Sequence, residues 1–224
     1  MSAQVGVAPG AQSARSSVRQ ALLLDWRAVE SGSVTVVLVA FPLVGGFGMW
    51  LGGTSLPSTL VVLWAAMVAL TPWRSDDTAV RRLRPSLGLP RRSIVTARYL
   101  WAGTAVLGLV LVTTIYVPVV GLLLNRPAAE ELTLTWWLGT GVMVVLAAGI
   151  PARIRRGRAA STVVMILVAV GTLALSAATM VLVPIDSDMT AYNLVAFALT
   201  AALAVIAVPL SYLDAQRAYA TKDL

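Results

Sequence analysis

The sequence contains no cysteine and no histidine. The chain therefore cannot form disulfides, build a zinc site from these ligands, or use a Cys–His or Ser–His–Asp group for catalysis. Lysine is nearly absent too, because Lys222 supplies only one of the 17 basic residues. An intramembrane serine protease that uses a histidine or lysine base is thereby excluded. The strong preference for arginine is typical of a GC-rich bacterial genome.

Charged residues are also scarce, at 12% of the chain, whereas a soluble domain carries roughly 25%. Hydrophobic residues make up 58%, and the mean hydropathy is +0.83. At about 20 apolar residues per crossing, the chain holds six candidate spans. They are residues 34–51, 56–72, 99–122, 132–150, 162–183 and 191–212. The sequence thus predicts an all-α integral membrane protein with six transmembrane helices and no soluble catalytic domain.

The charges are distributed unevenly around these spans. With a cytoplasmic N-terminus, 16 of the 17 basic residues fall on the cytoplasmic side, and only Arg126 falls outside. The two outer loops carry acidic residues instead, namely Glu130, Glu131, Asp186 and Asp188. This asymmetry follows the positive-inside rule and predicts that both termini are cytoplasmic. The net charge of +7 is then a topology signal, and no nucleic-acid partner is expected.

No ionisable residue lies deep within any of the six spans. Ion-coupled transporters keep such groups near the midplane, so their absence argues against a proton antiporter and an intramembrane carboxylate enzyme. The polar groups within the spans are Thr104, Thr113, Thr114, Tyr116, Thr172, Ser176 and Thr200. We expect most of them to bind carbonyls one turn back along their own helix, and we assign them no ligand role.

The chain divides into one membrane domain with short polar flanks. The regions are a disordered tail over 1–16, an interfacial connecting helix over 17–32, the six-helix domain over 33–213 and a cytoplasmic tail over 214–224. Within the connecting helix, one apolar face carries Val18, Leu22, Trp26 and Val29. This spacing predicts an N-terminal interfacial helix that lies along the inner leaflet.

The loop over 74–98, between the second and third spans, is longer than a minimal turn. It holds seven arginines and two aspartates. Ser75 suits a helix N-cap, and Asp76 and Asp77 suit the positive end of the helix dipole that follows. The sequence therefore predicts a helix in this loop, and we interpret the loop as a cytoplasmic docking element.

The helix predicted in this loop is amphipathic. Val80, Leu83 and Leu87 share one face, and arginines that include Arg81 and Arg84 occupy the other. The alternative role, anchoring of the arginines to anionic lipid at about 1 kcal/mol each, requires neither the acidic cap nor the apolar face. The apolar face favours a protein partner.

A second helix is predicted after this amphipathic segment. Pro90 suits the first position of a helix, and Arg91 begins the run that leads into the third span. No phosphate-binding G-x-x-x-x-G-K-[ST] loop occurs in the chain. Energy for uphill transport would therefore have to enter from another protein through the docking element.

Three segments resemble the membrane subunits of ABC-2 type (ABC exporter) permeases. LLLDWRAVESGS, at 22–33, is similar to the family's N-terminal connecting helix. LRPSLGLPRRSIVTARYL, at 83–100, resembles its pattern of an apolar pair, a proline and an arginine before the third span. The closing SYLDAQRAYATKDL is similar to its final Ser…Tyr…Lys-Asp segment. With six spans and both termini inside, the resemblance covers nearly the whole chain.

The resemblance implies a complex of several subunits. Two permease subunits, as a homodimer or heterodimer, would form the path, and two ABC-type ATPase subunits would bind beneath them. ATP and Mg²⁺ would bind the ATPase, so this chain is expected to bind no cofactor itself and not to be an enzyme. The implied ATPase-coupling residues are Asp76, Asp77, Val80, Arg81, Leu83, Arg84, Leu87, Pro90 and Arg91. Membrane lipid is the other implied partner, in the bacterial cytoplasmic membrane.

One departure from the family bears on the substrate. Larger members fold re-entrant helices between spans five and six, where this chain has only residues 184–190. The resemblance therefore implies export of a peptide, a lipid or a hydrophobic small molecule rather than a large polysaccharide. A six-span membrane anchor or assembly factor that transports nothing explains the topology equally well, but not the insert over 75–92. A membrane-embedded enzyme is disfavoured because the catalytic groups are missing.

Overall fold

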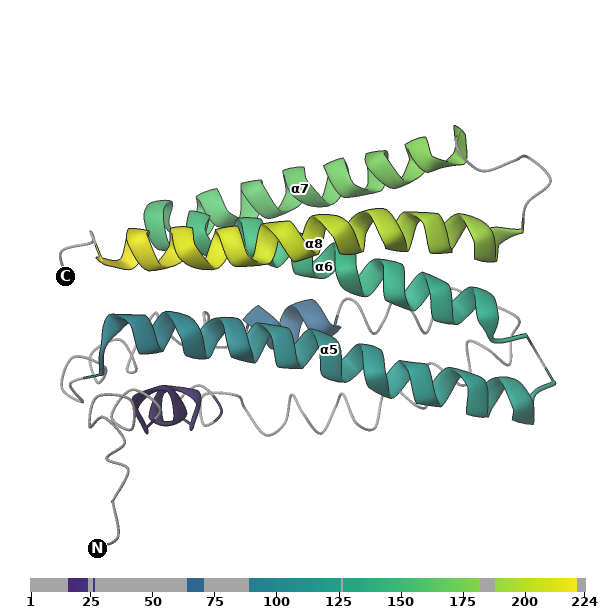
Figure 1. Cartoon of the computed structure of the whole chain (residues 1–224), viewed down its shortest axis with the longest axis horizontal. Helices are drawn as coiled ribbons and strands as arrows, with labels where there is room; N and C mark the ends of the chain where they lie inside the picture. The colour runs from purple at the N-terminus through teal and green to yellow at the C-terminus, as the bar shows by residue number, and fades with distance from the viewer. Residues whose placement is uncertain are drawn as a thin grey trace, which may run out of the picture.

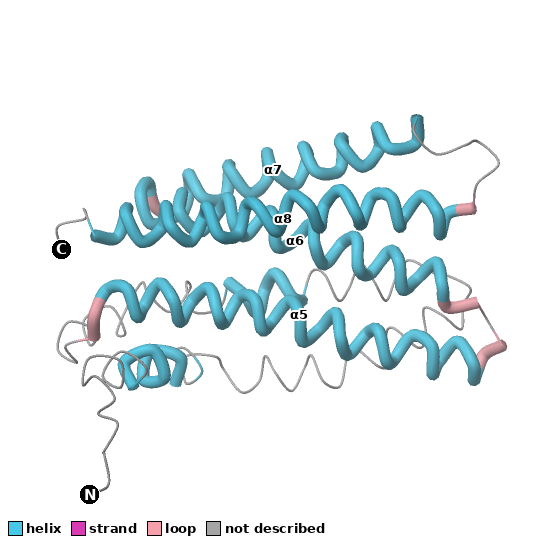
Figure 2. Tube along the Cα trace, in the orientation of Figure 1, coloured by secondary structure: helices cyan, strands magenta, loops and turns pink. Residues whose placement is uncertain are grey.

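The computed structural model describes residues 16–23, 26, 64–70, 89–125, 127–181 and 188–220. Four long helices follow one another in this part: α5 (Arg91–Leu123), α6 (Ala129–Arg156), α7 (Arg158–Ala178) and α8 (Met189–Ala220). A short 3-10 helix, η2 (Thr179–Val181), follows α7 directly. Residues 16–23, 26 and 64–70 are also helical. The regular elements of the described part are all helices, as an all-α protein requires (Figure 2).

The four long helices are each apolar and long enough to cross a membrane. They contain the predicted spans 99–122, 132–150 and 191–212, and α7 with η2 covers most of 162–183. Of the predicted span 56–72 only 64–70 is described. The span 34–51, nearly all of the tail over 1–16, half of the connecting helix and most of the coupling loop lie outside the described residues. The count of six spans and the interfacial placement therefore stay predictions.

The two ends of this bundle differ in charge. One end of the bundle, where α5 and α7 begin and α6 and α8 end, is rich in arginine, and we call it the basic end. Its arginines are Arg91, Arg92, Arg98, Arg153, Arg155, Arg156, Arg158 and Arg217. The opposite, acidic end carries Glu130, Glu131 and Asp188. Figure 1 shows the basic end on the left. On α6 both sets interact favourably with the helix dipole, because acidic residues occupy the first turn of the helix and basic residues occupy its last turn.

The helices differ in length. At 1.5 Å per residue, the 33 residues of α5 and the 32 of α8 extend about 50 Å, against a hydrocarbon core about 30 Å thick. The 21 residues of α7 extend only about 32 Å. In Figure 1, α7 begins set back from the points where α5 begins and α8 ends. At the basic end, α5 and α8 thus project beyond the level at which α7 starts.

The connection between α6 and α7 is shorter than the gap over 151–161 between the predicted spans 132–150 and 162–183. Helix α6 continues through Pro151 to Arg156, and only Gly157 separates it from α7. Gly157 has a φ of 85°, a left-handed conformation that glycine adopts without a Cβ clash. A proline inside a membrane helix is tolerated because the backbone carbonyl that loses its hydrogen bond finds another partner. The glycine, not the proline, therefore ends the helix.

The distribution of side chains is the reverse of that in a soluble protein. Large apolar side chains are exposed along the outside, among them Leu111, Ile115, Leu122, Leu167 and Val205. Polar side chains are buried between the helices, among them Thr113, Thr135, Ser161, Thr200 and Ser211. Lipid solvates apolar groups but offers polar groups no hydrogen bonds. This arrangement, together with four spanning helices, is that of a multi-pass membrane protein.

Helix α6 lies at the centre of the described bundle. It packs against α5, α7 and α8, with α8 as its most extensive neighbour. The most apolar 18-residue stretch of α6 is less apolar than the corresponding stretch of each of the other three helices, and it is also the most buried of the four. The helix that faces protein on most sides is thus the least apolar, as expected where lipid contacts only the outer helices.

Glycines let the neighbouring helices approach α6 closely. A Cβ built on Gly139 would lie 2.5 Å from Cγ2 of Val110 on α5. A Cβ on Gly149 would meet the side chain of Met165 on α7. Valine is fixed at χ1 in a helix, whereas methionine has three rotatable bonds and moves aside readily. Gly139 is therefore the position where α5 and α6 depend on the missing side chain.

We predict that Gly139→Ala destabilises the protein by about 1–3 kcal/mol, the usual effect of inserting a methyl group into a filled contact. The cause is the stiff Val110 side chain, which has to move with α5. Thermal unfolding in detergent measures the change. Gly141→Ala is the matched control, because a Cβ there meets no atom within 4 Å. Equal stability of the two variants would contradict the close contact.

Candidate functional site

The sequence placed the ATPase-coupling residues at 76–91, and the structure describes only the end of this segment. Asp76, Asp77, Val80, Arg81, Leu83, Arg84 and Leu87 lie outside the described residues. Pro90 and the backbone of Arg91 lie within them. The apolar face and the arginine face of the coupling helix therefore stay predictions.

Pro90 occupies a different position from the predicted one. It was expected at the first helical position, but it is the N-cap of α5, with φ −59° and ψ 136°, and the helix begins at Arg91. The Pro90 carbonyl accepts hydrogen bonds from the N–H groups of Ser93 (2.9 Å) and Ile94 (3.4 Å). The prediction was wrong by one residue, because the fixed φ of proline suits a helix but its ψ here is extended.

The first turns of α5 are buried against the other helices at the basic end. Ile94, Val95 and Ala97 are buried apolar residues, and Val95 shares one core cluster with Ile154 of α6 and Ala215 of α8. The start of α5 therefore moves only if its neighbours move with it.

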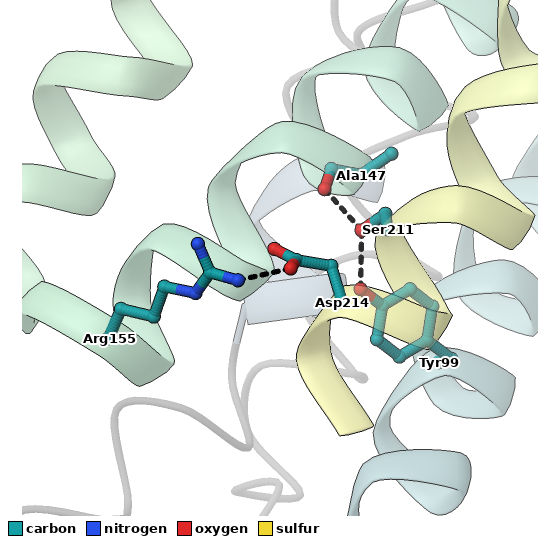
Figure 3. Close-up of polar contacts among 5 residues, drawn as sticks. All are labelled: Tyr99, Ala147, Arg155, Ser211 and Asp214. Atoms are coloured by element: carbon teal, nitrogen blue, oxygen red, sulfur yellow. Dashed lines mark hydrogen bonds and ion pairs between the residues drawn. The ribbon is translucent and has the colours of Figure 1, made fainter. Parts of the chain in front are cut away.

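Three helices meet in a chain of hydrogen bonds at this end (Figure 3). The Ser211 hydroxyl on α8 donates to the carbonyl of Ala147 on α6. Its oxygen also binds the Tyr99 hydroxyl on α5. Serine has only one hydroxyl proton, so Tyr99 is the donor in that second bond. Ser211 thus joins α5 to α6 through α8.

Two further polar contacts bind α8 to its neighbours near Ser211. Arg155, in the last turn of α6, forms an ion pair with Asp214 (Figure 3). Thr96 of α5 hydrogen-bonds the Tyr212 hydroxyl at 2.9 Å. The ring of Tyr212 also packs edge-on against Tyr99, with centroids 5.4 Å apart. The last turns of α8 are therefore fastened to both α5 and α6.

A second set of polar contacts lies nearer the acidic end and centres on two tryptophans of α6. Trp136 Nε1 donates to Thr114 of α5 at 3.0 Å, and Trp137 Nε1 donates to Ser176 of α7 at 2.9 Å. The ring of Trp137 packs edge-on against Tyr192 of α8. Both indoles of α6 thus join it to a neighbouring helix.

The hydroxyls within the spans bind as the sequence predicted. Each of six hydroxyls donates a hydrogen bond to the carbonyl oxygen of residue i−4 on the preceding turn; these residues are Thr104, Thr113, Thr114, Thr172, Ser176 and Thr200. Thr114, Ser176 and Thr200 make an interhelical bond as well. Sequence reasoning missed these second bonds because their partners are distant in the chain.

Two buried charged side chains lie just outside the predicted spans. Arg98 of α5 is 2% exposed and Glu131 of α6 is 1% exposed. Each stands one position before the residue at which its span was predicted to start. Because both helices begin earlier than these spans, the side chains fall among packed helices. In the sequence, the feature that could have indicated this burial is a charged residue directly before an apolar run, which both Arg98 and Glu131 are.

Among the described residues, no three His, Cys, Asp or Glu side chains come together as the ligands of a metal ion would. The hydroxyls at the basic end bind one another or carbonyls, and Asp214 binds an arginine. What the arrangement can do is hold α5, α6 and α8 together, so that a displacement of one helix reaches the other two.

We predict that Ser211→Ala lowers the stability of the protein by about 1–3 kcal/mol, because the buried Ala147 carbonyl and Tyr99 hydroxyl lose their partner. Tyr99→Phe should add little to this loss, and a double-mutant cycle in detergent measures the coupling. Thr162→Ala is the control, because its exposed hydroxyl binds only a carbonyl of its own helix. Additive effects of Ser211→Ala and Tyr99→Phe would contradict a shared chain.

Comparison with known proteins gives one family. Its model, described as ABC-2 family transporter protein, matches residues 23–220. The match includes the coupling segment, α5, α6, α7 and α8, and it ends where α8 ends. Searches of curated proteins and of solved structures found no match. The matched segment is nearly the whole chain, and the protein therefore belongs to the ABC-2 family of transporter proteins, as an ABC-2 type permease.

Proposed function

We propose that the chain is the permease subunit of a bacterial ABC exporter. In this proposal it moves a peptide, a lipid or a hydrophobic small molecule out of the cytoplasm, using ATP hydrolysed by a separate subunit. Two copies of an ABC-type ATPase bind two permease subunits, which are identical or different. ATP and Mg²⁺ bind the ATPase. The observation that carries the proposal is the family match over residues 23–220, since such permeases generally work with ABC ATPases.

The orientation follows from the charges at the two ends of the bundle. The arginines of α5, α6, α7 and α8 gather at the basic end, and the acidic end carries Glu130, Glu131 and Asp188. Under the positive-inside rule, the basic end faces the cytoplasm of a bacterial plasma membrane, with both termini on that side. The segment over 75–89 precedes α5 and would then face the ATPase.

The continuity of α5 supports a route for the energy. Helix α5 runs without a break from Arg91 to Leu123 and extends about 50 Å. It begins two residues after the segment over 75–89 and ends at the acidic end. The only proline inside α5 is Pro118, in its last two turns, so the part from Arg91 to Val117 has no proline at which the helix would kink. We infer that closure of the ATPase displaces the start of α5, and that α5 carries the displacement across the membrane.

The polar contacts around Ser211 support the inference that a displacement of α5 also moves α6 and α8. Ser211 and Tyr212 connect α8 with α5, and Ser211 also connects it with the carbonyl of Ala147 on α6. Breaking these buried bonds during the motion would cost several kcal/mol in an apolar environment. The three helices therefore move together at the basic end.

We predict that replacing Leu83 and Leu87 by aspartate abolishes binding of the ATPase. The physical reason is that a charge on the apolar face of the coupling helix would be buried in the cleft of the partner. Affinity purification from mild detergent, followed by mass spectrometry, measures the ATPase that accompanies the wild type and the variant.

The paired substitution of Leu83 and Leu87 by methionine is the matched control, because it keeps the face apolar and nearly isosteric. It should retain the ATPase at the wild-type ratio, and all three proteins should reach the membrane in equal amounts. A wild type purified without any ATPase across several mild detergents would favour a membrane anchor or assembly factor. An aspartate variant that keeps its ATPase would remove the coupling role from this face.

A further inference from the structure

We propose that Arg156 and Arg158 bind the phosphate of an anionic phospholipid whose acyl chain lies along the exposed face of α7. The site would be at the junction of α6 and α7, in whichever leaflet the basic end meets. This inference needs the protein to lie in a membrane but does not depend on transport or on an ATPase.

Four arginines near the ends of α5, α6 and α7 differ in their surroundings. Arg98 is buried among packed helices, and Arg155 forms an ion pair with Asp214. Arg156 and Arg158 are both exposed, and neither forms an ion pair with any residue that the structure describes. They flank Gly157, the single residue between α6 and α7. Two positive charges thus stand close in sequence at one tight turn, available to an anion from outside.

The length of α7 places this pair at the depth of lipid headgroups. Helix α7 begins at Arg158 and extends about 32 Å over its 21 residues, which matches the roughly 30 Å hydrocarbon core. Its first residue therefore lies at the boundary of that core. Arg92 and Arg217 stand on α5 and α8, which project beyond the start of α7 (Figure 1). The junction is the part of the basic end best placed for phosphate.

An exposed apolar strip continues from the junction along α7. It consists of Val163, Ile166, Leu167, Val170 and Leu173, which are between 56% and 65% exposed. Spacings of three and four place them on one face of the helix. Counted from Arg158, Val163 lies about 8 Å and Leu167 about 14 Å into the hydrocarbon core, so the part of the strip between them lies within the leaflet at the basic end, which is about 15 Å deep. A lipid with its phosphate at the arginines would have its chain on this strip.

Charge decides between a lipid and a second copy of the chain. In a symmetric dimer whose axis is normal to the membrane, equivalent residues lie at the same depth. Two copies joined through their α7 faces would bring Arg156 and Arg158 next to the same pair of the partner, and like charges repel. A phosphate instead accepts the paired N–H groups of a guanidinium and neutralises it. The strip and the pair together therefore fit an anionic phospholipid.

The test uses the full-length protein reconstituted in vesicles of phosphatidylglycerol and phosphatidylcholine in equal amounts. Native mass spectrometry measures the phosphatidylglycerol that stays bound. We expect the double variant Arg156→Ala/Arg158→Ala to retain it about 25-fold less than wild type, or about fivefold per arginine. Arg156→Lys/Arg158→Lys should stay within a few fold of wild type. Arg92→Ala/Arg217→Ala removes the same charge from the same end and should leave retention unchanged.

A second measurement needs no variant. A phosphatidylglycerol with a photoactivatable acyl chain should label wild-type α7 between residues 159 and 173 more than α5 or α8. Unchanged retention in the Arg156→Ala/Arg158→Ala variant, or an equal loss in the Arg92→Ala/Arg217→Ala variant, would overturn the site, as would even labelling of all helices. Loss of a dimer, or of a bound ATPase, with lipid retention intact would assign the surface to that protein and also overturn it.

Discussion

The bundle depends on polar and close-packed contacts that converge on α6. Lipid surrounds apolar side chains as well as a protein core does, so hydrophobic burial gives little reason for these helices to associate. What remains is hydrogen bonding between helices and close approach at small residues. Trp136 and Trp137 bind α5 and α7, the Ala147 carbonyl binds α8, and Gly139 lets α5 come near. Each neighbour of α6 is thus held by a contact that lipid cannot replace.

These contacts determine which helices of the permease are joined to one another. Helices α5 and α8 are longer than the membrane is thick, and their projecting ends are joined at the basic end through Ser211 and Tyr212. Helix α7 is shorter, and its most apolar 18-residue stretch is the least buried among those of the four helices. A displacement that enters at α5 therefore reaches α6 and α8 directly. Helix α7 follows through α6, and its outer face stays open to lipid.

Much of the fold was predictable from the sequence, because apolar length and charge asymmetry are local signals. The four described helices contain or largely cover spans that the apolar runs predicted, and the family resemblance was confirmed by the match over 23–220. The hydroxyls of Thr113 and Thr172 bind their own helices as expected. These properties depend on residues within a few turns of one another.

The errors share a cause, which is that tertiary contacts override local signals. The predicted span over 132–150 ends before Pro151, but α6 continues through Pro151 and ends at the left-handed Gly157. Ser211 was assigned to the end of the sixth span and Asp214 to the cytoplasmic tail, yet both bind α6 in the folded protein. Nothing in the sequence pairs Trp137 with Ser176, which lies 39 residues away. The coupling residues other than Pro90 and Arg91 lie outside the described part, so the predicted ATPase contact remains to be tested by experiment.

The most direct test of the account is a distance measurement across the acidic end of the permease–ATPase complex. The chain has no cysteine, so Leu123→Cys and Met189→Cys give two specific spin-label sites, both at exposed positions. Electron paramagnetic resonance should report a shifted distance distribution when ATP is added, because in the proposed mechanism α5 carries the motion of the ATPase to its far end. Hydrolysis of ATP by the complex with an unchanged distribution would contradict the role given to α5.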